Sequence, residues 1–176
     1  MLSRLARNAV KARFAAAWES KLDAIVATFG DVSAADKARL AQIDWTASSK
    51  QVFMGQVSIE AIENTTAKKW PVVILFAAEL NHDGLEKFAN FSGSSVVNLE
   101  FHFSWIKSAA LPNFDETMDL IEEAVLGVMH DKSWLGALDD GLTYTGQMSA
   151  TRGAVQESGE NWTQAISFRF TFGIDV

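Results

Sequence analysis

The stretch from Val96 to Lys107, VVNLEFHFSWIK, carries the clearest strand pattern in the chain. Every second side chain in it is apolar, namely Val97, Leu99, Phe101, Phe103 and Trp105. The side chains between them are mostly polar and include Glu100 and His102. Because successive side chains of a strand point to opposite faces of a sheet, this alternation predicts a strand with one buried and one solvent-facing side.

The chain after this strand predicts a loop, a helix and a closing hairpin. Residues 114–130 form the predicted helix, because their apolar side chains recur every three or four positions. Residues 142–155 show a weaker strand pattern, and residues 162–174 show a strong one. The turn-like sequence QESGEN at residues 156–161 joins these two strands into a predicted hairpin.

The chain before Val96 predicts two further strands and a loop. Residues 51–60 alternate like a half-buried strand. Residues 70–78, WPVVILFAA, are apolar on both sides, as a central strand would be. Residues 81–95 are polar and include two glycines, which predicts a long loop.

The N-terminal segment predicts two helices. Residues 2–29 carry one apolar stripe with helical spacing, and Gly30 follows where a helix commonly stops. The stripe consists of Val10, Phe14, Trp18, Leu22, Ile25 and Phe29. Ser33 begins a capping-box pattern, which predicts a short helix over residues 34–43.

This order of elements predicts an α+β fold in a single domain, residues 1–176. The helical N-terminal part spans residues 1–43, and the sheet spans residues 51–176 with the helix 114–130 inserted. One-sided strands favour a mostly antiparallel or mixed sheet, with the long N-terminal helix and the central helix packed on one face.

Composition narrows the classes of function. The chain has 176 residues, a formal net charge of −7 and no cysteine. Disulfides, thiolate catalysis and Cys-ligated metal centres are therefore excluded. The negative charge argues against a protein that grips nucleic acid by overall charge, and no apolar run is long enough to predict a membrane span. No short motif for nucleotide binding, zinc proteolysis or serine hydrolysis is present.

The N-terminal helix is basic through Arg4, Arg7 and Lys11. The simplest interpretation is a solvated basic face. A helix that docks on a partner, a phosphate or a membrane surface is the second interpretation, and a targeting segment is the third. The apolar stripe continues to Phe29 without a break that resembles a cleavage site, which argues against targeting.

Two sets of charged residues could carry chemistry. Asp115, Asp119 and Glu122 share one face of the predicted central helix, where carboxylates bind hard cations, act as acid and base, or simply face solvent. His102 and Glu100 lie on the same side of their strand, as a general base and its carboxylate partner would. The simpler interpretation of both sets is a polar surface.

Tryptophans indicate core positions with two exceptions. Most of the six follow the apolar side of their element. Trp45 and Trp134 lie in polar connections, where aromatic side chains are enriched at protein interfaces, so these two are the interface candidates.

The second half of the chain resembles the tail terminator (tail completion) proteins of tailed bacteriophages. The resemblance rests on VVNLEFHFSWIK, FDETMDLIEEAVLGVM, WLGALDDGLTYTG and WTQAISFRFTFGIDV, and covers residues 96–176. It implies an N-terminal helix, a sheet, a long helix after the third strand and a closing hairpin. It also implies a ring of typically six subunits that ends the tail tube at its head-proximal side, with no catalysis and no cofactor.

The resemblance implies partners and a location as well. The partners would be other copies of the chain, the tail tube protein and head–tail connector or neck proteins, with DNA passing through the ring without specific binding. The protein would act in the virion tail or neck and in the host cytoplasm during assembly, away from membranes. Residues expected at contacts are Arg4, Arg7, Lys11, Trp45, Trp134 and Arg169; those expected on a lumen or solvent face are Asp115, Asp119 and Glu122.

Two other hypotheses stay open. The chain could be a tail tube or head–tail connector component, in which case it would form filaments or a different ring. It could also be a non-viral ligand-binding protein or enzyme of the α+β class, with its site around Glu100, His102 and the acidic helix.

Overall fold

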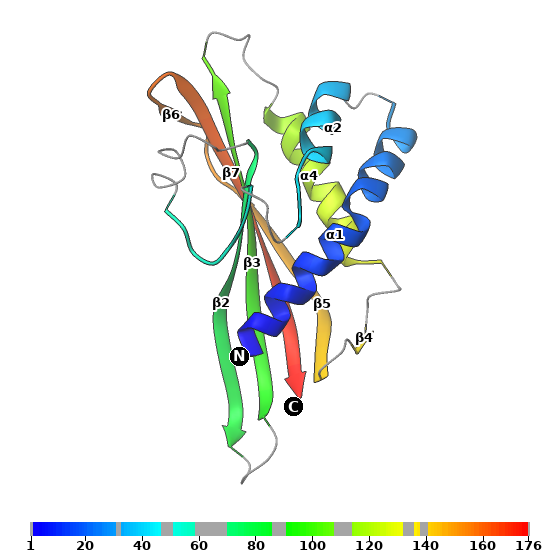
Figure 1. Cartoon of the computed structure of the whole chain (residues 1–176), viewed down its shortest axis with the longest axis vertical. Helices are drawn as coiled ribbons and strands as arrows, with labels where there is room; N and C mark the ends of the chain where they lie inside the picture. Colours follow the sequence, from blue (N-terminus) through cyan, green and yellow to red (C-terminus); the bar gives the residue numbers. More distant parts are fainter. Residues whose placement is uncertain are drawn as a thin grey trace.

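A mixed sheet of seven strands carries three helices on one face (Figure 1). The computed structural model describes residues 2–30, 33–46, 51–58, 70–85, 91–107, 114–131, 136–137 and 141–175, and these counts refer to them. The helices are α1 (Leu2–Thr28), α2 (Ala34–Ala41) and α4 (Phe114–Met129). The strands are β1 (Val52–Met54), β2 (Val72–Leu85), β3 (Phe91–Ile106), β4 (Gly136–Ala137), β5 (Leu142–Arg152), β6 (Gln156–Ser158) and β7 (Asn161–Asp175). The predicted α+β class is confirmed.

The strands follow the order β1-β2-β3-β7-β5-β4, and β6 pairs with β7 beyond the end of β5. The β1–β2 pair is parallel and every other pair is antiparallel. The pair β3–β7 runs without a register shift from Ser92 opposite Asp175 to Ile106 opposite Asn161. These two long strands therefore form the centre of the sheet.

The closing hairpin is confirmed, with a tighter turn than the sequence predicts. Ser158 already pairs with Asn161, so only Gly159 and Glu160 lie between the strands. Gly159 has a φ of +55°, a backbone conformation that glycine adopts without a steric cost. The second strand of the hairpin is β7, and the first is divided into β5 and β6 by residues 153–155.

The predicted loop over residues 81–95 is wrong. β2 continues to Leu85 and β3 begins at Phe91, so most of this range forms a long hairpin that extends past the helices (Figure 1). A part of a sheet that no helix covers has no need of apolar residues on alternate positions, so the pattern that reveals a strand is missing there.

The predicted strand over residues 51–60 is much shorter than expected. It ends at Met54, because the next residue, Gly55, leaves the extended conformation with a φ of +138°. The Gly55 N–H still donates to the Leu75 carbonyl at 2.9 Å, which is the last hydrogen bond of the β1–β2 pair. Val52 enters the main core, while Phe53 packs on the opposite side of the sheet.

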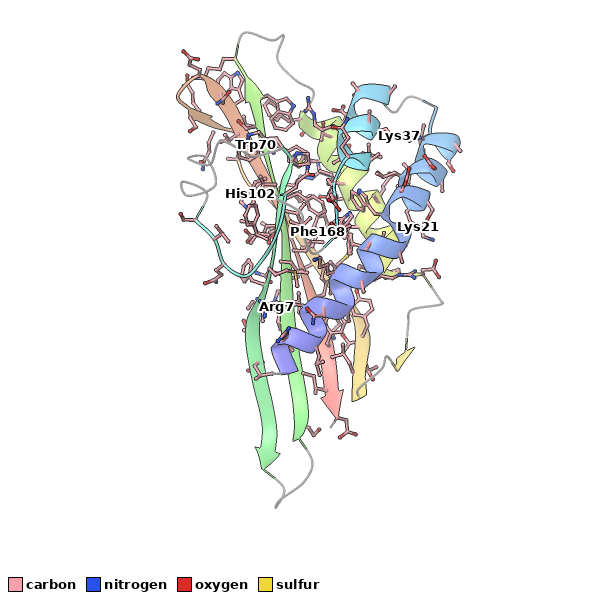
Figure 2. The ribbon with its side chains drawn as sticks, viewed as in Figure 1. Arg7, Lys21, Lys37, Trp70, His102 and Phe168 are labelled. Carbon is pink, nitrogen blue, oxygen red and sulfur yellow. The ribbon has the colours of Figure 1, made fainter. Side chains whose placement is uncertain are left out.

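The main core lies between the helices and the sheet. α1 crosses β2 and β3 and packs along α4. Its Trp18 stacks on Phe101 at 5.6 Å between ring centroids, and the indole N–H donates to the Leu40 carbonyl of α2 at 2.9 Å. Phe168 of β7 lies beneath them, edge-on to Phe101 (Figure 2). Aromatic contacts of this kind hold α1 and α2 to the central strands.

Candidate functional site

The face of the sheet opposite the helices is polar over its central strands. We call it the open face. Its side chains on β3 and β7 include Asn98, Glu100, His102, Ser104, Thr163, Ser167, Arg169 and Thr171. Only the β2 side is apolar, where Val72 and Ile74 pack with Phe53, Val57 and Trp70. The open face is therefore a surface for polar contacts, with an apolar strip along one side.

His102 and Glu100 meet on this face as the sequence predicts. His102 Nε2 lies 3.1 Å from a Glu100 carboxylate oxygen, and both side chains are partly exposed. His102 also borders a cavity of about 270 Å³ together with Trp70, Thr163 and the segment Gly153–Ala154 (Figure 2). Among the described residues that line this cavity, His102 is the one with an ionisable side chain. The arrangement fits a small binding pocket better than a set of catalytic groups.

β2 and β5, each bordered by a short edge strand, present free edges over most of their length among the described residues. β4 pairs only with Thr143 and Tyr144, so the outer edge of β5 beyond them has no strand partner. β1 covers β2 only from Val73 to Leu75, so the outer edge of β2 beyond Leu75 is free as well. Such rows of N–H and C=O groups can pair with a strand of another chain.

The two free edges run in opposite directions and lie at different levels. β2, β3, β7 and β5 are successively antiparallel, so β2 and β5 are antiparallel to each other. Through the register, Val73 lies level with Phe101, Ile166 and Arg152. The upper part of β5 thus lies level with the part of β2 that β1 covers. The middle of the free part of β2 is displaced along the strands from the middle of the free part of β5, toward Leu85, by about five residues or roughly 17 Å.

Of the basic residues expected at contacts, those near the start of α1 have no ionic partner among the described residues. Arg4 is exposed, and Arg7 and Lys11 are half-buried. The Nε atom of Arg7 is buried without a hydrogen-bond partner (Figure 2). Further along α1, Lys21 is different, because its ammonium group lies 2.8 Å from an Asp131 carboxylate oxygen. Positive charge is therefore left uncompensated at the first three turns of α1.

Arg152 of β5 binds two of the three carboxylates on the predicted acidic face of α4. Its guanidinium Nε donates to Glu122 at 2.7 Å, and a terminal nitrogen lies 2.5 Å from Asp119. These hydrogen bonds, to Glu122 first and Asp119 second, raise the pKa of Arg152 above its ordinary value. Asp115 is exposed at the start of the helix. Two of the three predicted carboxylates thus anchor an outer strand of the sheet to the helix.

A groove lies where the end of α1, the start of α2 and α4 meet. We call it the α1–α2–α4 groove. It has a volume of about 180 Å³, and Ile25, Phe29 and Leu120 form its apolar floor. Its rim carries four carboxylates, which are Asp36, Glu116, Asp119 and Glu123. The sequence did not predict this groove, because its residues come from three segments that only tertiary packing brings together. The local feature that points to the groove is the exposed Phe29 at the end of α1.

The remaining contact candidates have three outcomes. Trp45 was expected at an interface, but it is only 5% exposed and packs 4.7 Å from Phe14 between ring centroids, so it is a core residue. The connection after α2 folds back over the core, which is why a polar segment contains a buried ring. Arg169 is exposed on the open face, 2.7 Å from Glu79 of β2. Trp134 lies outside the described residues.

Four further findings complete the description of the chain. No protein-family model matches the chain, and no curated protein matches it. In the described part of the chain, no three His, Asp or Glu side chains are arranged to hold a metal ion. None of the described helices combines the length and the apolar character needed to cross a membrane.

Proposed function

We propose that the chain is a structural virion protein, a tail terminator that forms a ring on the head-proximal end of a phage tail tube. The observation that carries the proposal is the pair of free edges on β2 and β5. Because the two edges are antiparallel, a second copy in the same orientation can place its β2 beside β5 and continue the alternation of the sheet. A contact between two different surfaces of identical copies closes into a ring when its rotation allows.

The difference in level between the two edges fits a ring whose strands tilt relative to the ring axis. Pairing the free part of β2 with the free part of β5 displaces each copy along the strands relative to its neighbour. Closed sheets require such a stagger, because their strands tilt relative to the axis. The resemblance of residues 96–176 to tail terminators, the order of the elements and the net charge of −7, which suits a lumen to which DNA does not adhere, support the same proposal.

The test is the mass of the purified chain by light scattering, with negative-stain images of the same peak. We expect closed rings, typically of six subunits, either alone or after isolated tail tubes are added. Filaments would favour a tube component instead, and a different closed ring that binds connectors but not tubes would favour a connector. A monomer that ignores tail tubes would overturn the proposal.

Lysine substitutions test the role of the edges. Ser149→Lys with Thr151→Lys adds charges to β5, an outer strand, where charged side chains oppose edge-to-edge pairing. We expect this variant to lose ring formation. The control, Ser167→Lys with Thr171→Lys, adds the same charges to the central strand β7 and should leave ring formation intact.

The cavity beside His102 favours one other candidate function, a small-molecule binding protein. Under this alternative His102→Ala abolishes binding, and ligand addition changes the NMR chemical shifts of the His102 ring. Under the ring proposal the same substitution leaves assembly unchanged, because His102 lies on neither free edge.

A further inference from the structure

We propose that the α1–α2–α4 groove receives the basic start of α1 from a second copy of the chain. The occupant is the segment with Arg4, Arg7 and Lys11, which lie three and four residues apart and so form one stripe on the helix. This inference rests on the proposed ring and specifies a second contact between its subunits.

The charges of the two surfaces are complementary. The groove is lined by four carboxylates around an apolar floor, and one of them, Asp119, is already bound by Arg152. The basic stripe has no ionic partner among the described residues, and a guanidinium nitrogen of Arg7 is buried without an acceptor. The first turn of α1 also contains no acidic residue, so nothing in that turn offsets the positive end of the helix dipole. Carboxylates of a neighbour would offset the positive charge of the stripe and of the helix end.

The two surfaces cannot meet within one chain. The stripe lies at the beginning of α1, whereas Ile25 and Phe29 of the groove lie at its end. At 1.5 Å per residue, Arg7 and Ile25 are about 27 Å apart along the helix axis. The contact therefore needs a second copy, and it joins two different surfaces, as a ring contact does.

The position of both surfaces agrees with pairing between β2 and β5. α1 begins over β2 and β3 (Figure 1). The groove takes three of its carboxylates from α4, and Arg152 ties α4 to β5. A neighbour that brings its β2 to β5 thus brings the start of its α1 toward the groove. The stagger that the free edges require also displaces this helix in the direction of the groove. Figure 1 shows that the end of α1, α2 and the start of α4, which supply the groove residues, lie above the start of α1.

Engineered disulfides test the contact, since the chain has no cysteine of its own. The variants Arg4→Cys and Glu123→Cys are purified separately, mixed and oxidised. We expect a disulfide-linked dimer in the mixture and almost none in either variant alone. Glu160→Cys, at an exposed acidic residue of the β6–β7 turn, replaces Glu123→Cys in the matched control and should give no dimer with Arg4→Cys.

Charge exchange provides a second measurement. Glu116→Lys with Glu123→Lys should lower the yield of rings about tenfold, because it places like charges together. Adding Arg4→Glu, Arg7→Glu and Lys11→Glu to that variant should restore the yield to about half of the wild type or better. The control pair, Glu19→Lys with Glu160→Lys, changes the net charge equally outside the groove and should leave the yield unchanged.

The outcomes separate this inference from the proposed function. Rings that form without a mixed disulfide, and that tolerate the lysine variants, overturn the groove contact and leave the tail terminator proposal in place. A dimer formed by Arg4→Cys alone shows a symmetric contact and also overturns the inference. A wild-type chain that stays monomeric with and without tail tubes overturns the proposed function, and a mixed disulfide in that case still supports a contact between copies.

Discussion

The two faces of the central strands differ, although consecutive residues of the same strands supply both of them. In β3 and β7, Leu99 lies opposite Phe168 beneath the helices, and both are completely buried. The next pair, Glu100 opposite Ser167, is on the open face and only partly buried. One face is therefore built for packing, with large apolar side chains, and the other carries small or polar groups that contribute little to a core. Stability and recognition are divided between alternate positions of one sheet.

Removing one side chain from each face should give the largest difference in the free energy of unfolding. Phe168→Ala removes a fully buried ring that touches Phe101, so we expect the free energy of unfolding to fall by about 3–5 kcal/mol. The neighbouring Ser167→Ala, on the open face, should change it by less than about 0.5 kcal/mol. Urea denaturation of both variants measures the difference. Equal losses would show that the open face is also part of a packed core in the isolated chain.

The covered face could be predicted from the sequence, whereas the contact surfaces could not. Alternation in β3 and β7 identified Phe101, Phe168 and their neighbours, because burial on one face imposes a period of two. The long β2–β3 hairpin was missed, since strand ends outside the core carry no such pattern. Trp45 was assigned to the surface because it lies in a polar segment. Arg152 and the groove were not found, because their partners are distant in sequence.

The buried tyrosine of the covered face should make stability depend on pH in the alkaline range. Tyr144 is 3% exposed, and burial raises its pKa from 10.0 to about 12. Between these values the unfolded chain loses its phenolic proton while the folded chain keeps it. The stabilising contribution is therefore complete below pH 10 and is lost as the pH rises through about 12.

The loss over this range should be about 2–3 kcal/mol. Tyr144→Phe has no phenol to ionise, so its free energy of unfolding should not show this component of the alkaline decline. Tyr144 is also the one tyrosine of the chain, so tyrosinate absorbance follows its ionisation directly. An apparent pKa near 10 in the folded protein would contradict the burial of this ring.

The ion pairs of Arg152, which join β5 to α4, should have a smaller effect on the free energy of unfolding. Arg152→Met keeps the length of the side chain but leaves Asp119 and Glu122 facing each other one helical turn apart. We expect a loss of about 1 kcal/mol in the free energy of unfolding, since the three groups are partly exposed and screened by solvent. The loss should shrink in high salt, where exposed charges are screened. A loss that salt does not alter would assign the effect to packing of the side chain instead.

The ion pair on the open face should contribute less to the free energy of unfolding than the contacts of Arg152. Arg169 and Glu79 are both about half exposed, and their contact joins β7 to β2 across β3. Two exposed side chains lose rotamer freedom when they pair, which offsets most of the Coulomb attraction in water. A double-mutant cycle of Arg169→Met and Glu79→Gln should therefore give a coupling energy below about 0.5 kcal/mol. A coupling of several times that size would mean that this pair is shielded from water, and that the open face supports the fold of the isolated chain as the covered face does.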